Sequence, residues 1–392
     1  MFIELHIIQN FAPSNLNRSD TGSPKDCEFG GVRRARISSQ CFKRAIRRDS
    51  GFFNDFIERS GGGVRTRRLI IEIAKRISSQ DPAPEKTVKL VAEVFNEGGI
   101  ERPKAKKGEE AEKDNTKLIL YMDNQAIDKM AAQFKDNWED LNGKNKEIRE
   151  QTIARLGEIL AQSVNVPDIA LFGRMVEIEG SKPFGKLQLG VDAACQVAQS
   201  ISTHKSGVEF DFYTAVDDLL PTGETGAGMM GTVEFNSACF YRYANVDMEQ
   251  LKKNLNGDEA LATETLEAFI RAAVHAVPTA KQNSMAAQNP PSFVLAVASD
   301  ARRWSLANAF EAPVRPSAMS GLVESSIKKL DDYWQQLTTA FGDGQIADKC
   351  YVNLSGKDLE HLNGSRVASV DVLVKKMREA VKFKGTGAGK ES

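Results

Sequence analysis

The order of apolar and polar positions predicts a chain in which strands alternate with helices. The first residues, FIELHIIQNF (2–11), are rich in β-forming side chains and predict a strand. A polar, turn-rich segment follows, after which Ser38 can cap a short helix that ends before Gly51. Phe42 and Ile46 supply the apolar stripe of this helix, because they are four residues apart.

The later segments complete an α+β pattern. From about 52 to 190 the apolar spacing is mostly helical, and the run 191–202 predicts a buried strand. The alternating stretch 232–247 predicts a strand, 258–277 a helix and 292–299 a last strand, and the final 75 or so residues look helical. Without two insertions the order is βαββαβ, the ferredoxin-like or RRM-like pattern. We therefore expect an α+β fold with this core.

The composition limits the classes of function. With 52 basic and 53 acidic side chains in 392 residues, any polyanion site must come from local segregation of charge. The five cysteines and four histidines are widely spaced, so we expect neither a metal nor another cofactor. No apolar run is long enough to cross a bilayer, and the first residues resemble a strand more than a signal peptide. We expect a cytoplasmic protein without a membrane partner.

One segment concentrates positive charge. Residues 29–48, FGGVRRARISSQCFKRAIRR, contain seven basic side chains and no acidic one. A solvated helix face normally carries both signs, whereas this one carries a single sign. The free N–H groups of a helix N-terminus also favour phosphate, and Gly30-Gly31 would let the backbone approach a ligand. The pattern predicts a polyanion-binding surface.

The other motifs are weaker. GAGMMG (226–231) matches GxGxxG, but it leads into a strand and lacks a phosphate-binding lysine, so a flexible loop is the better interpretation. Asp20, Asp26 and the pair Asp217-Asp218 are the candidate carboxylates for metal or acid–base chemistry. Spacing alone supports no active site, although it excludes none.

Several motifs together resemble one family. They are NLNRSDTGSPKDCEFGGVRRARISSQCFKRAIR (15–47), ALFGRM, FDFYTAVDDL, FYRYANVD, VPTAKQNS and SLANAF, in this order. In them the chain resembles the CasC-type backbone subunit of Cascade, the CRISPR surveillance complex of type I-E systems. The matching segments extend from residue 1 to about 315, while the helical region from about 52 to 160 and the C-terminal tail match only in character.

The resemblance implies a hand-shaped subunit that polymerises along CRISPR guide RNA. The implied parts are a palm (1–60, 192–203 and 232–315), a helical fingers insertion (61–191), a thumb loop (204–231) and a C-terminal helical segment and tail (316–392). The filament would kink the guide at intervals, flip one base out and leave the others free to pair with target DNA. The implied partners are guide RNA, target DNA, neighbouring copies of the chain, other Cascade subunits and a recruited helicase–nuclease. The subunit itself is implied to be non-catalytic.

The resemblance also implies which residues contact RNA. The expected set lies in the quoted motifs and comprises Arg18, Lys25, Arg34, Ser38, Gln40, Lys43, Arg47, Arg174, Met175, Phe212, Tyr213, Thr214, Lys281 and Gln282. Most of them would hold phosphates, which gives affinity without reading sequence. Met175 would act as an apolar wedge beside the displaced nucleotide. Which of Arg33, Arg34 and Arg36 reach the RNA is left open.

Two other functions stay open. Related backbone subunits of type III systems cut target RNA with an aspartate of the first palm loop, and Asp20 and Asp26 lie in that loop here. A metal-dependent endoribonuclease is therefore the main alternative. A simpler alternative makes the basic segment a surface for another protein.

Overall fold

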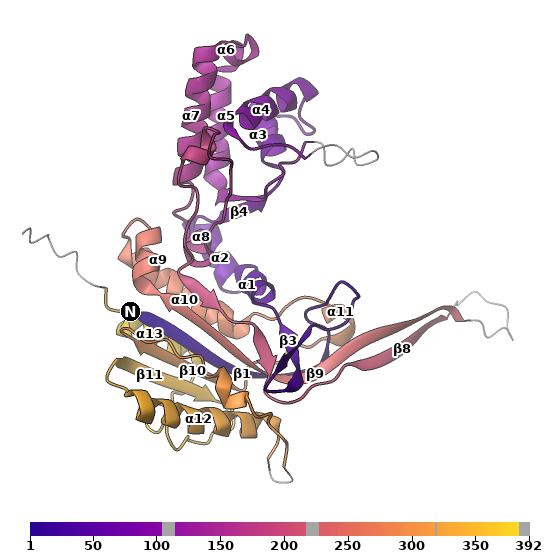
Figure 1. Ribbon diagram of the computed structural model, residues 1–392, viewed down its shortest axis with the longest axis vertical. Helices are drawn as coiled ribbons and strands as arrows, with labels where there is room; N and C mark the ends of the chain where they lie inside the picture. Colours follow the sequence, from indigo (N-terminus) through magenta and orange to yellow (C-terminus); the bar gives the residue numbers. More distant parts are fainter. Residues whose placement is uncertain (104–113, 217–226, 318–319, 384–392) are drawn as a thin grey trace, which may run out of the picture. The chain divides into compact units, whose positions relative to one another are not determined.

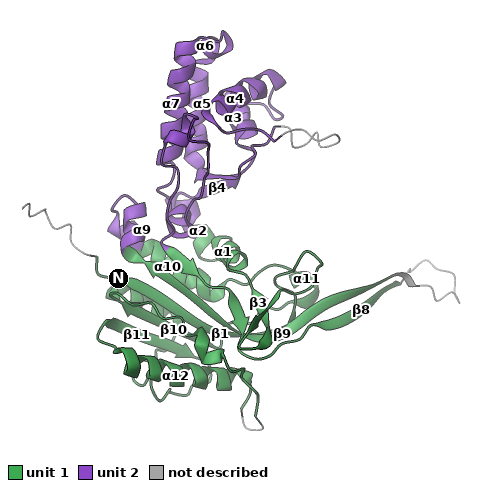
Figure 2. Cartoon of the chain, in the orientation of Figure 1, with its two compact units in different colours: residues 1–54, 195–248, 263–392 green, residues 55–194, 249–262 purple. Residues whose placement is uncertain are grey.

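The computed structural model describes residues 1–103, 114–216, 227–317 and 320–383. They form two compact units, which Figure 2 shows in different colours. Unit 1 comprises residues 1–54, 195–248 and 263–392, and unit 2 comprises residues 55–194 and 249–262. Unit 2 is thus made largely from one long insertion in the sequence of unit 1. The predicted boundaries of palm, fingers and thumb remain predictions.

Among the described residues, a nine-stranded sheet forms the centre of unit 1 (Figure 1). Seven strands pair in the order β11-β10-β1-β9-β7-β3-β2, and β6 and β8 also pair with β9. Their bounds are β1 Phe2–Ser14, β2 Asp26–Phe29, β3 Val32–Ile37, β6 Cys195–Val197, β7 Ser200–Ser202, β8 Glu209–Val216, β9 Ala227–Asp247, β10 Phe293–Ser299 and β11 Ile346–Asn353. The first predicted strand, β1, lies between the last, β10, and the third, β9, with antiparallel pairing on both sides. The predicted α+β fold is confirmed.

Helices cover both faces of this sheet. The helical segments of unit 1 are α1 Ser39–Arg47, most of α10 Glu259–His275, α11 Gln282–Met285, η3 Ala307–Phe310, α12 Leu322–Phe341 and α13 Val370–Ala380. On one face Phe42 of α1 packs with Phe11 and Phe240, and on the other Trp334 of α12 packs with Ile8 and other strand residues. A sheet that is covered on both faces offers no open platform for base stacking.

Two strand predictions need correction. The predicted strand 191–202 is split into β6 and β7, because Val197 pairs with Ala244 whereas Ile201 pairs with Tyr241, which leaves one extra residue between them. The predicted helical C-terminal region contains an edge strand, β11, between α12 and α13. Its apolar positions follow neither a strand nor a helix period cleanly, and its pairing partner β10 lies far away in sequence.

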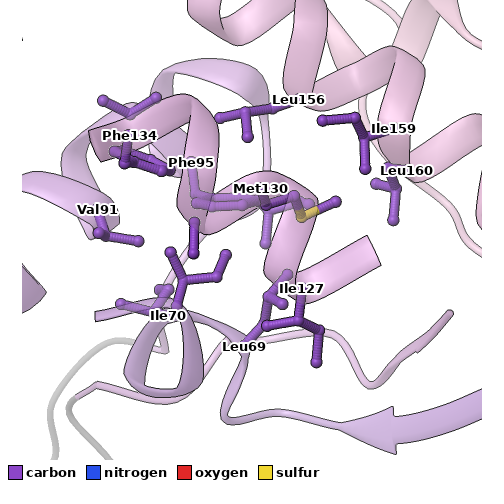
Figure 3. Close-up of a cluster of buried hydrophobic side chains, with 14 of the residues drawn as sticks. Leu69, Ile70, Val91, Phe95, Ile127, Met130, Phe134, Leu156, Ile159 and Leu160 are labelled. Carbon is purple, nitrogen blue, oxygen red and sulfur yellow. The ribbon is translucent and has the colours of Figure 1, made fainter. Parts of the chain in front are cut away.

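Unit 2 is mostly helical, as predicted, around a core from α3, α4, α5 and α7 (Figure 3). Phe95, Met130, Phe134 and Leu156 are fully buried there. A short antiparallel pair, β4 with β5, accompanies the helices. The bounds of the elements are α2 Phe53–Ser60, β4 Gly63–Thr66, α3 Leu69–Ser78, α4 Glu85–Gly98, β5 Leu120–Asp123, α5 Asn124–Asp136, α6 Trp138–Asn142, α7 Lys146–Gln162, α8 Pro167–Phe172, η2 Phe184–Lys186 and α9 Met248–Asn254, of which α2 and α9 begin in unit 1.

Candidate nucleic-acid interface

The loop after β1 is folded back onto the start of α1. The carbonyl of Asn17 accepts a hydrogen bond from the Lys25 amide at 2.8 Å, and its Oδ1 accepts one from the Ser38 amide at 2.8 Å. The Lys25 carbonyl accepts from the Arg36 amide at 2.9 Å. The loop that carries Arg18 and Lys25 is therefore held beside the N-terminus of the helix.

Helix α1 has the cap and the apolar stripe that its sequence predicts. The Oγ of Ser38 accepts a hydrogen bond from the Cys41 amide at 3.3 Å, which satisfies one of the free N–H groups of the first turn. Phe42 and Ile46 are buried against the sheet. Arg44 is exposed and Lys43 half-exposed, and the first turn contains no acidic residue. The helix thus presents positive charge that its own residues do not neutralise.

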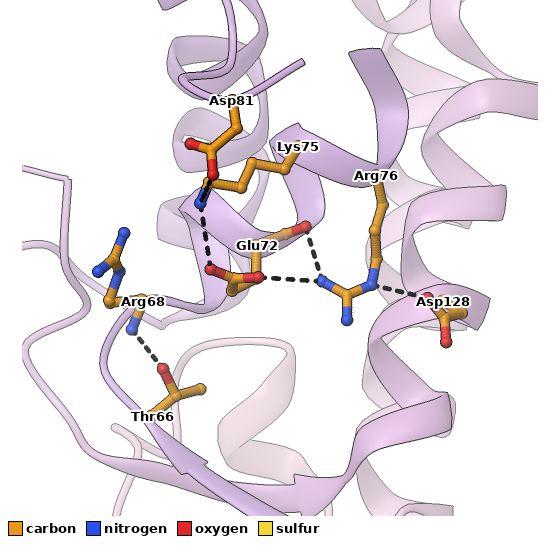
Figure 4. A network of polar contacts seen from close by, with 7 residues as sticks. All are labelled: Thr66, Arg68, Glu72, Lys75, Arg76, Asp81 and Asp128. Carbon is orange, nitrogen blue, oxygen red and sulfur yellow. Dashed lines mark hydrogen bonds and ion pairs between the residues drawn. The ribbon is translucent and has the colours of Figure 1, made fainter. Parts of the chain in front are cut away.

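The charges on α1 differ from those on α3 of unit 2, a surface helix of similar length. On α3, Arg76 lies between Glu72 at 3.2 Å and Asp128 at 2.7 Å (Figure 4). On α1, by contrast, neither Lys43 nor Arg44 has a carboxylate within ion-pair distance among the described residues. Helix α3 therefore has the mixed charges of an ordinary solvated face, and α1 does not.

Arg34 lies in the interior of unit 1. Its guanidinium donates to the carbonyls of Phe29 and Ser202 at 3.1 Å, of Phe310 at 2.8 Å and of Glu311 at 3.1 Å. Its side chain is fully buried. We therefore correct the prediction that Arg34 contacts RNA, because its side chain is buried and its donors are used by backbone carbonyls of its own unit.

The two neighbouring arginines also have partners within unit 1. Arg33 forms an ion pair with Asp26 at 2.9 Å, and the Nε of Arg36 donates to the Asp26 carbonyl at 3.1 Å. Arg36 also donates to the side chain of Gln199. These contacts hold the β2–β3 hairpin together, so the positive charge of β3 is partly used by the fold itself.

The glycine pair before β3 closes the β2–β3 hairpin, at the end of the segment that the sequence predicted to be polar and turn-rich. Gly30 and Gly31 both have left-handed backbone angles, with φ of 61° and 69°. A Cβ on Gly30 would lie 1.9 Å from the Glu311 carbonyl oxygen. The turn and this close approach therefore explain the glycines, and no approach to a ligand is needed.

Lys281 belongs to a loop, residues 278–291, whose backbone is tightly constrained. Lys281 and Ala286 have positive φ angles of 56° and 47°, which L-residues rarely adopt. Between them, the Nε2 of Gln282 donates to the carbonyls of Pro278 at 3.0 Å and Ala287 at 3.4 Å. The side-chain amide of Gln282 thus stabilises its own loop, while Lys281 remains half-exposed.

One hydrophobic cluster joins the three segments that carry these residues. Leu16 from the first loop, Phe42 from α1 and Ala287 from the 278–291 loop pack in it together with Phe11 and Phe240. The residues predicted to contact phosphates lie on these three segments, around the same cluster. They are Arg18, Lys25, Ser38, Gln40, Lys43, Arg47, Lys281 and Gln282. We call this set, without Gln282, the basic surface.

The predicted thumb loop is a two-stranded ribbon of β8 and the first part of β9 (Figure 1). Phe210 and Phe212 are 69% and 64% exposed, and Met230 is 65% exposed opposite Thr214. These four residues share one face, because they lie at alternate or paired positions of the ribbon. Residues 217–226, including Asp217, Asp218 and the first glycine of GAGMMG, lie outside the described residues.

The other face of the ribbon carries Tyr213, which is packed over a glycine. A Cβ on Gly231 would lie 2.4 Å from the Tyr213 hydroxyl, so the ring covers the glycine of the partner strand. The sequence contains no basic residue between Lys205 and Arg242, but six acidic ones. The ribbon therefore offers aromatic surface without any charge that would attract phosphate.

In unit 2, Arg174 and Met175 have opposite environments. Arg174 is buried and donates to the carbonyls of Leu189 at 2.7 Å and Leu160 at 3.0 Å. Burial lowers its pKa to about 10. Met175 is 86% exposed. We correct the predicted RNA contact of Arg174, because its side chain is enclosed, whereas Met175 is accessible as a wedge must be.

The two candidate catalytic carboxylates that the structure describes, Asp20 and Asp26, have different environments. Asp20 is exposed, whereas Asp26 is paired with Arg33. Across the described ranges, no group of three or more His, Cys, Asp or Glu side chains is arranged to hold a metal ion. Nor does any helix in those ranges have the length and apolar character needed to cross a membrane.

Sequence reasoning missed two kinds of residue at these sites. Asn17 organises the basic surface by its hydrogen bonds, and only a turn-forming composition marks it in sequence. Phe210 and Met230 extend the exposed apolar face of the ribbon. In the sequence FDF, Phe210 lies two residues before Phe212, so a strand would place both on one face, and this pattern could have identified Phe210. The place of Met230 on that face follows only from its pairing with Thr214.

Comparison with known proteins agrees with the motif resemblance. The family described as CT1975-like protein matches residues 3–379. A chain of a solved "CRISPR RNA-guided surveillance complex, pre-nicking" is 31% identical, with a TM-score of 0.81 over 97% of this chain and 100% of that one. A chain of a "CRISPR RNA-guided surveillance complex" is 29% identical, with a TM-score of 0.72 over the same shares. No significant match to a curated protein was found. The predicted resemblance to surveillance-complex subunits is confirmed, and the type I-E subtype stays a prediction.

Proposed function

The chain belongs to the CT1975-like protein family, and from this premise we propose that it is a guide-RNA-binding backbone subunit of a CRISPR surveillance complex. The observation that carries the proposal is the basic surface, where cations from three segments surround one hydrophobic cluster. The likeness to chains of RNA-guided surveillance complexes over 97% of the chain supports it.

The chemistry of the basic surface suits a backbone contact. Lysine and arginine bind phosphates of any sequence, as a subunit that must accept any spacer requires. Specificity then belongs to base pairing between the guide and target DNA. Since α12 covers one face of the sheet and α1 the other, the bases are not held on an open sheet as in many RRM domains. They remain available for pairing.

A charge-reversal pair tests RNA binding. We expect Lys43→Glu/Arg47→Glu to reduce the RNA retained by the purified full chain by at least about tenfold, because two phosphate contacts become repulsive. Lys75→Glu/Arg76→Glu on α3 is the matched control and should leave the retained RNA unchanged, measured by absorbance at equal protein concentration. Equal RNA content in wild type and the α1 variant would contradict the proposal.

We further propose that the β8–β9 ribbon contacts neighbouring copies of the chain. Its acidic composition disfavours phosphate, and its exposed Phe210 and Phe212 suit a partly apolar protein surface or a base. We expect Phe210→Ser/Phe212→Ser to shorten the assemblies formed on long RNA without removing single-chain binding. Asp211→Asn is the control on the other ribbon face. Wild-type assembly length in the serine variant would refute this role.

The proposed subunit does not cut RNA; cleavage would belong to a recruited helicase–nuclease, and the other Cascade subunits would complete the assembly. The test is incubation of the RNA-loaded protein with guide-matched RNA and magnesium. We expect intact target RNA. Regular cleavage that Asp20→Ala abolishes would establish the endoribonuclease alternative instead. The proposal also implies a cytoplasmic setting, where guide RNA is made.

A further inference from the structure

Arg242 is a buried cation beneath the basic surface. It lies on β9, is 5% exposed, and has no ion-pair partner among the residues that the structure describes. Its guanidinium lies 4.1 Å from the ring centroid of Phe42 on α1 and donates to the Ala273 carbonyl at 2.5 Å. Ala273 is in the last turn of α10, where free carbonyls favour a positive charge. Arg242 therefore connects both helices of this face.

A second side chain extends this connection to the 278–291 loop. Gln9 on β1 is fully buried, and its Oε1 accepts a hydrogen bond from Arg242 at 2.5 Å. Its Nε2 donates to the Asn289 carbonyl at 2.7 Å. The chain of contacts thus runs from Phe42 through Arg242 and Gln9 to Asn289. It begins at the helix that carries Lys43 and ends in the loop that carries Lys281.

Packing alone does not account for these two residues. A buried arginine without a carboxylate is expensive to desolvate, and an apolar side chain of similar volume often stabilises a core more. A methionine or leucine at these positions could fill the space but could not form directional hydrogen bonds. Such bonds fix the angle and spacing of the elements that they join. The Gln9 amide has a donor on one side and an acceptor on the other, and both are used.

We propose that Gln9 and Arg242 are positioning residues that fix the 278–291 loop relative to α1, so that Lys281 and the α1 cations contact successive parts of one RNA backbone. This proposal rests on the proposed RNA binding. Neither side chain touches the RNA, since both are buried. Their role is to hold the loop in one conformation before RNA binds, so that binding does not have to pay the conformational entropy of ordering it.

The test is Gln9→Glu in the full chain. The carboxylate keeps an acceptor for Arg242 and adds an ion pair, but it places an oxygen against the Asn289 carbonyl in place of a donor. We therefore expect thermal stability that equals or exceeds the wild type, together with faster hydrogen exchange in residues 278–291. Affinity for a labelled single-stranded RNA should fall about threefold to tenfold, and the salt slope should flatten by up to about 0.7, as after loss of one phosphate contact on a single strand.

Two comparisons separate positioning from other effects. Gln9→Met removes the donor without adding charge, so it should reproduce the affinity loss, and it replaces Gln9→Glu if that variant does not fold. Lys281→Ala should lower RNA affinity little further in either Gln9 variant, because the contact of Lys281 with phosphate is already lost there. Lys25→Ala should keep its full effect, since its loop is held independently by Asn17.

The outcomes distinguish the inference from the function on which it rests. If the wild type binds no RNA, the proposed function fails. If the wild type binds RNA and Lys281→Ala weakens binding, but both Gln9 variants bind as tightly as the wild type with unchanged exchange in the loop, the function stands and the positioning role is refuted. If Lys25→Ala and Lys281→Ala lowered RNA affinity equally in the Gln9 variants, the positioning role would also be refuted.

Discussion

The two faces of the unit 1 sheet both bury polar side chains, but they use different chemistry. On the face that α1 covers, Gln9 and Arg242 bond each other and reach toward the basic surface. On the face that α12 covers, Glu4 accepts hydrogen bonds from the Tyr243 hydroxyl at 2.6 Å and the Trp304 amide at 2.8 Å. Strand β1 contributes to both faces because successive side chains point in opposite directions.

The titration of the buried groups differs between the faces. Burial lowers the pKa of Arg242 only to about 9, so it stays charged at neutral pH, and Gln9 does not titrate. Burial raises the pKa of Glu4 from 4.5 to about 7 and lowers that of His6 from 6.5 to about 3. The α12 face should therefore govern how stability depends on pH, and the α1 face should govern the geometry of RNA binding.

Removing the largest anchor from each face should give the largest effects. Phe42 and Trp334 are 1% and 3% exposed, and truncating either to alanine should lower the free energy of unfolding by about 3–5 kcal/mol. Only Phe42→Ala should also weaken RNA binding by the protein that remains folded, because it releases α1. Denaturant unfolding and RNA titration on the same samples check this. Equal RNA losses in the two variants would remove the distinction between the faces.

Glu4 and His6 should have opposite effects on stability between pH 4.5 and 6.5. With its folded pKa near 7, Glu4 retains a proton that the unfolded chain loses above 4.5, so its contribution falls as pH rises. His6 stays neutral in the fold while the unfolded chain takes up a proton below 6.5, so its contribution falls as pH drops. In the wild type the two slopes should nearly cancel across this window.

Glu4→Gln should expose the slope of His6. Tyr243 and Trp304 both bond the Oε2 of Glu4, so the glutamine carbonyl can replace it without a titrating proton. Stability of the variant should then fall by about 1.4 kcal/mol per pH unit from 6.5 down to 4.5. Denaturant unfolding at several pH values measures this. A variant whose stability is as flat as the wild type would show that His6 contributes no slope, and hence that neither group titrates as described.

Local sequence signals predicted α1 and the central strands, but not the interior partners of the arginines. Ser38, Phe42 and Ile46 define the helix within nine residues, and β1 and β10 are long apolar runs. Arg34 is different, because its acceptors at Ser202 and Phe310 lie 168 and 276 residues away. Arginine is usually exposed, so nothing local marks an arginine that is surrounded by carbonyls.

The same limit applies to the candidate site as a whole. The cations of α1 and the first loop could be proposed from their single sign, and the family motifs added Lys281. That Leu16, Phe42 and Ala287 bring three segments to one cluster follows only from the tertiary fold. The ribbon was missed as a strand pair because β8, with 8 residues, pairs with only the first part of β9, which has 21 residues, across a glycine-rich stretch.

Single-charge removal should sharpen the difference between the basic surface and an ordinary charged face. Lys43→Gln should weaken RNA binding about fivefold and flatten the salt slope by about 0.7, the value for one contact on a single strand. Lys75→Gln on α3 is the matched control: its partner Asp81 lies at 2.8 Å in an exposed pair, so only stability should change, by less than about 0.5 kcal/mol. RNA titrations at several salt concentrations measure the slopes, and the same slope for both variants would argue against a dedicated surface.

The smallest effect expected is at Ala286, where the α1 face stores backbone strain. A left-handed alanine costs roughly 1–2 kcal/mol, and glycine relieves this at an entropic cost of about 0.4–1 kcal/mol in the unfolded chain. Ala286→Gly should therefore raise the free energy of unfolding by about half a kcal/mol, whereas glycine at the buried neighbour Ala287 should lower it. If strain serves to hold Lys281 in place, the more stable Ala286→Gly protein should bind RNA slightly more weakly and show faster exchange in the loop. Tighter binding by that variant would mean that the constrained backbone hinders the contact with RNA, and the α1 face would then owe its geometry to Gln9 and Arg242 alone.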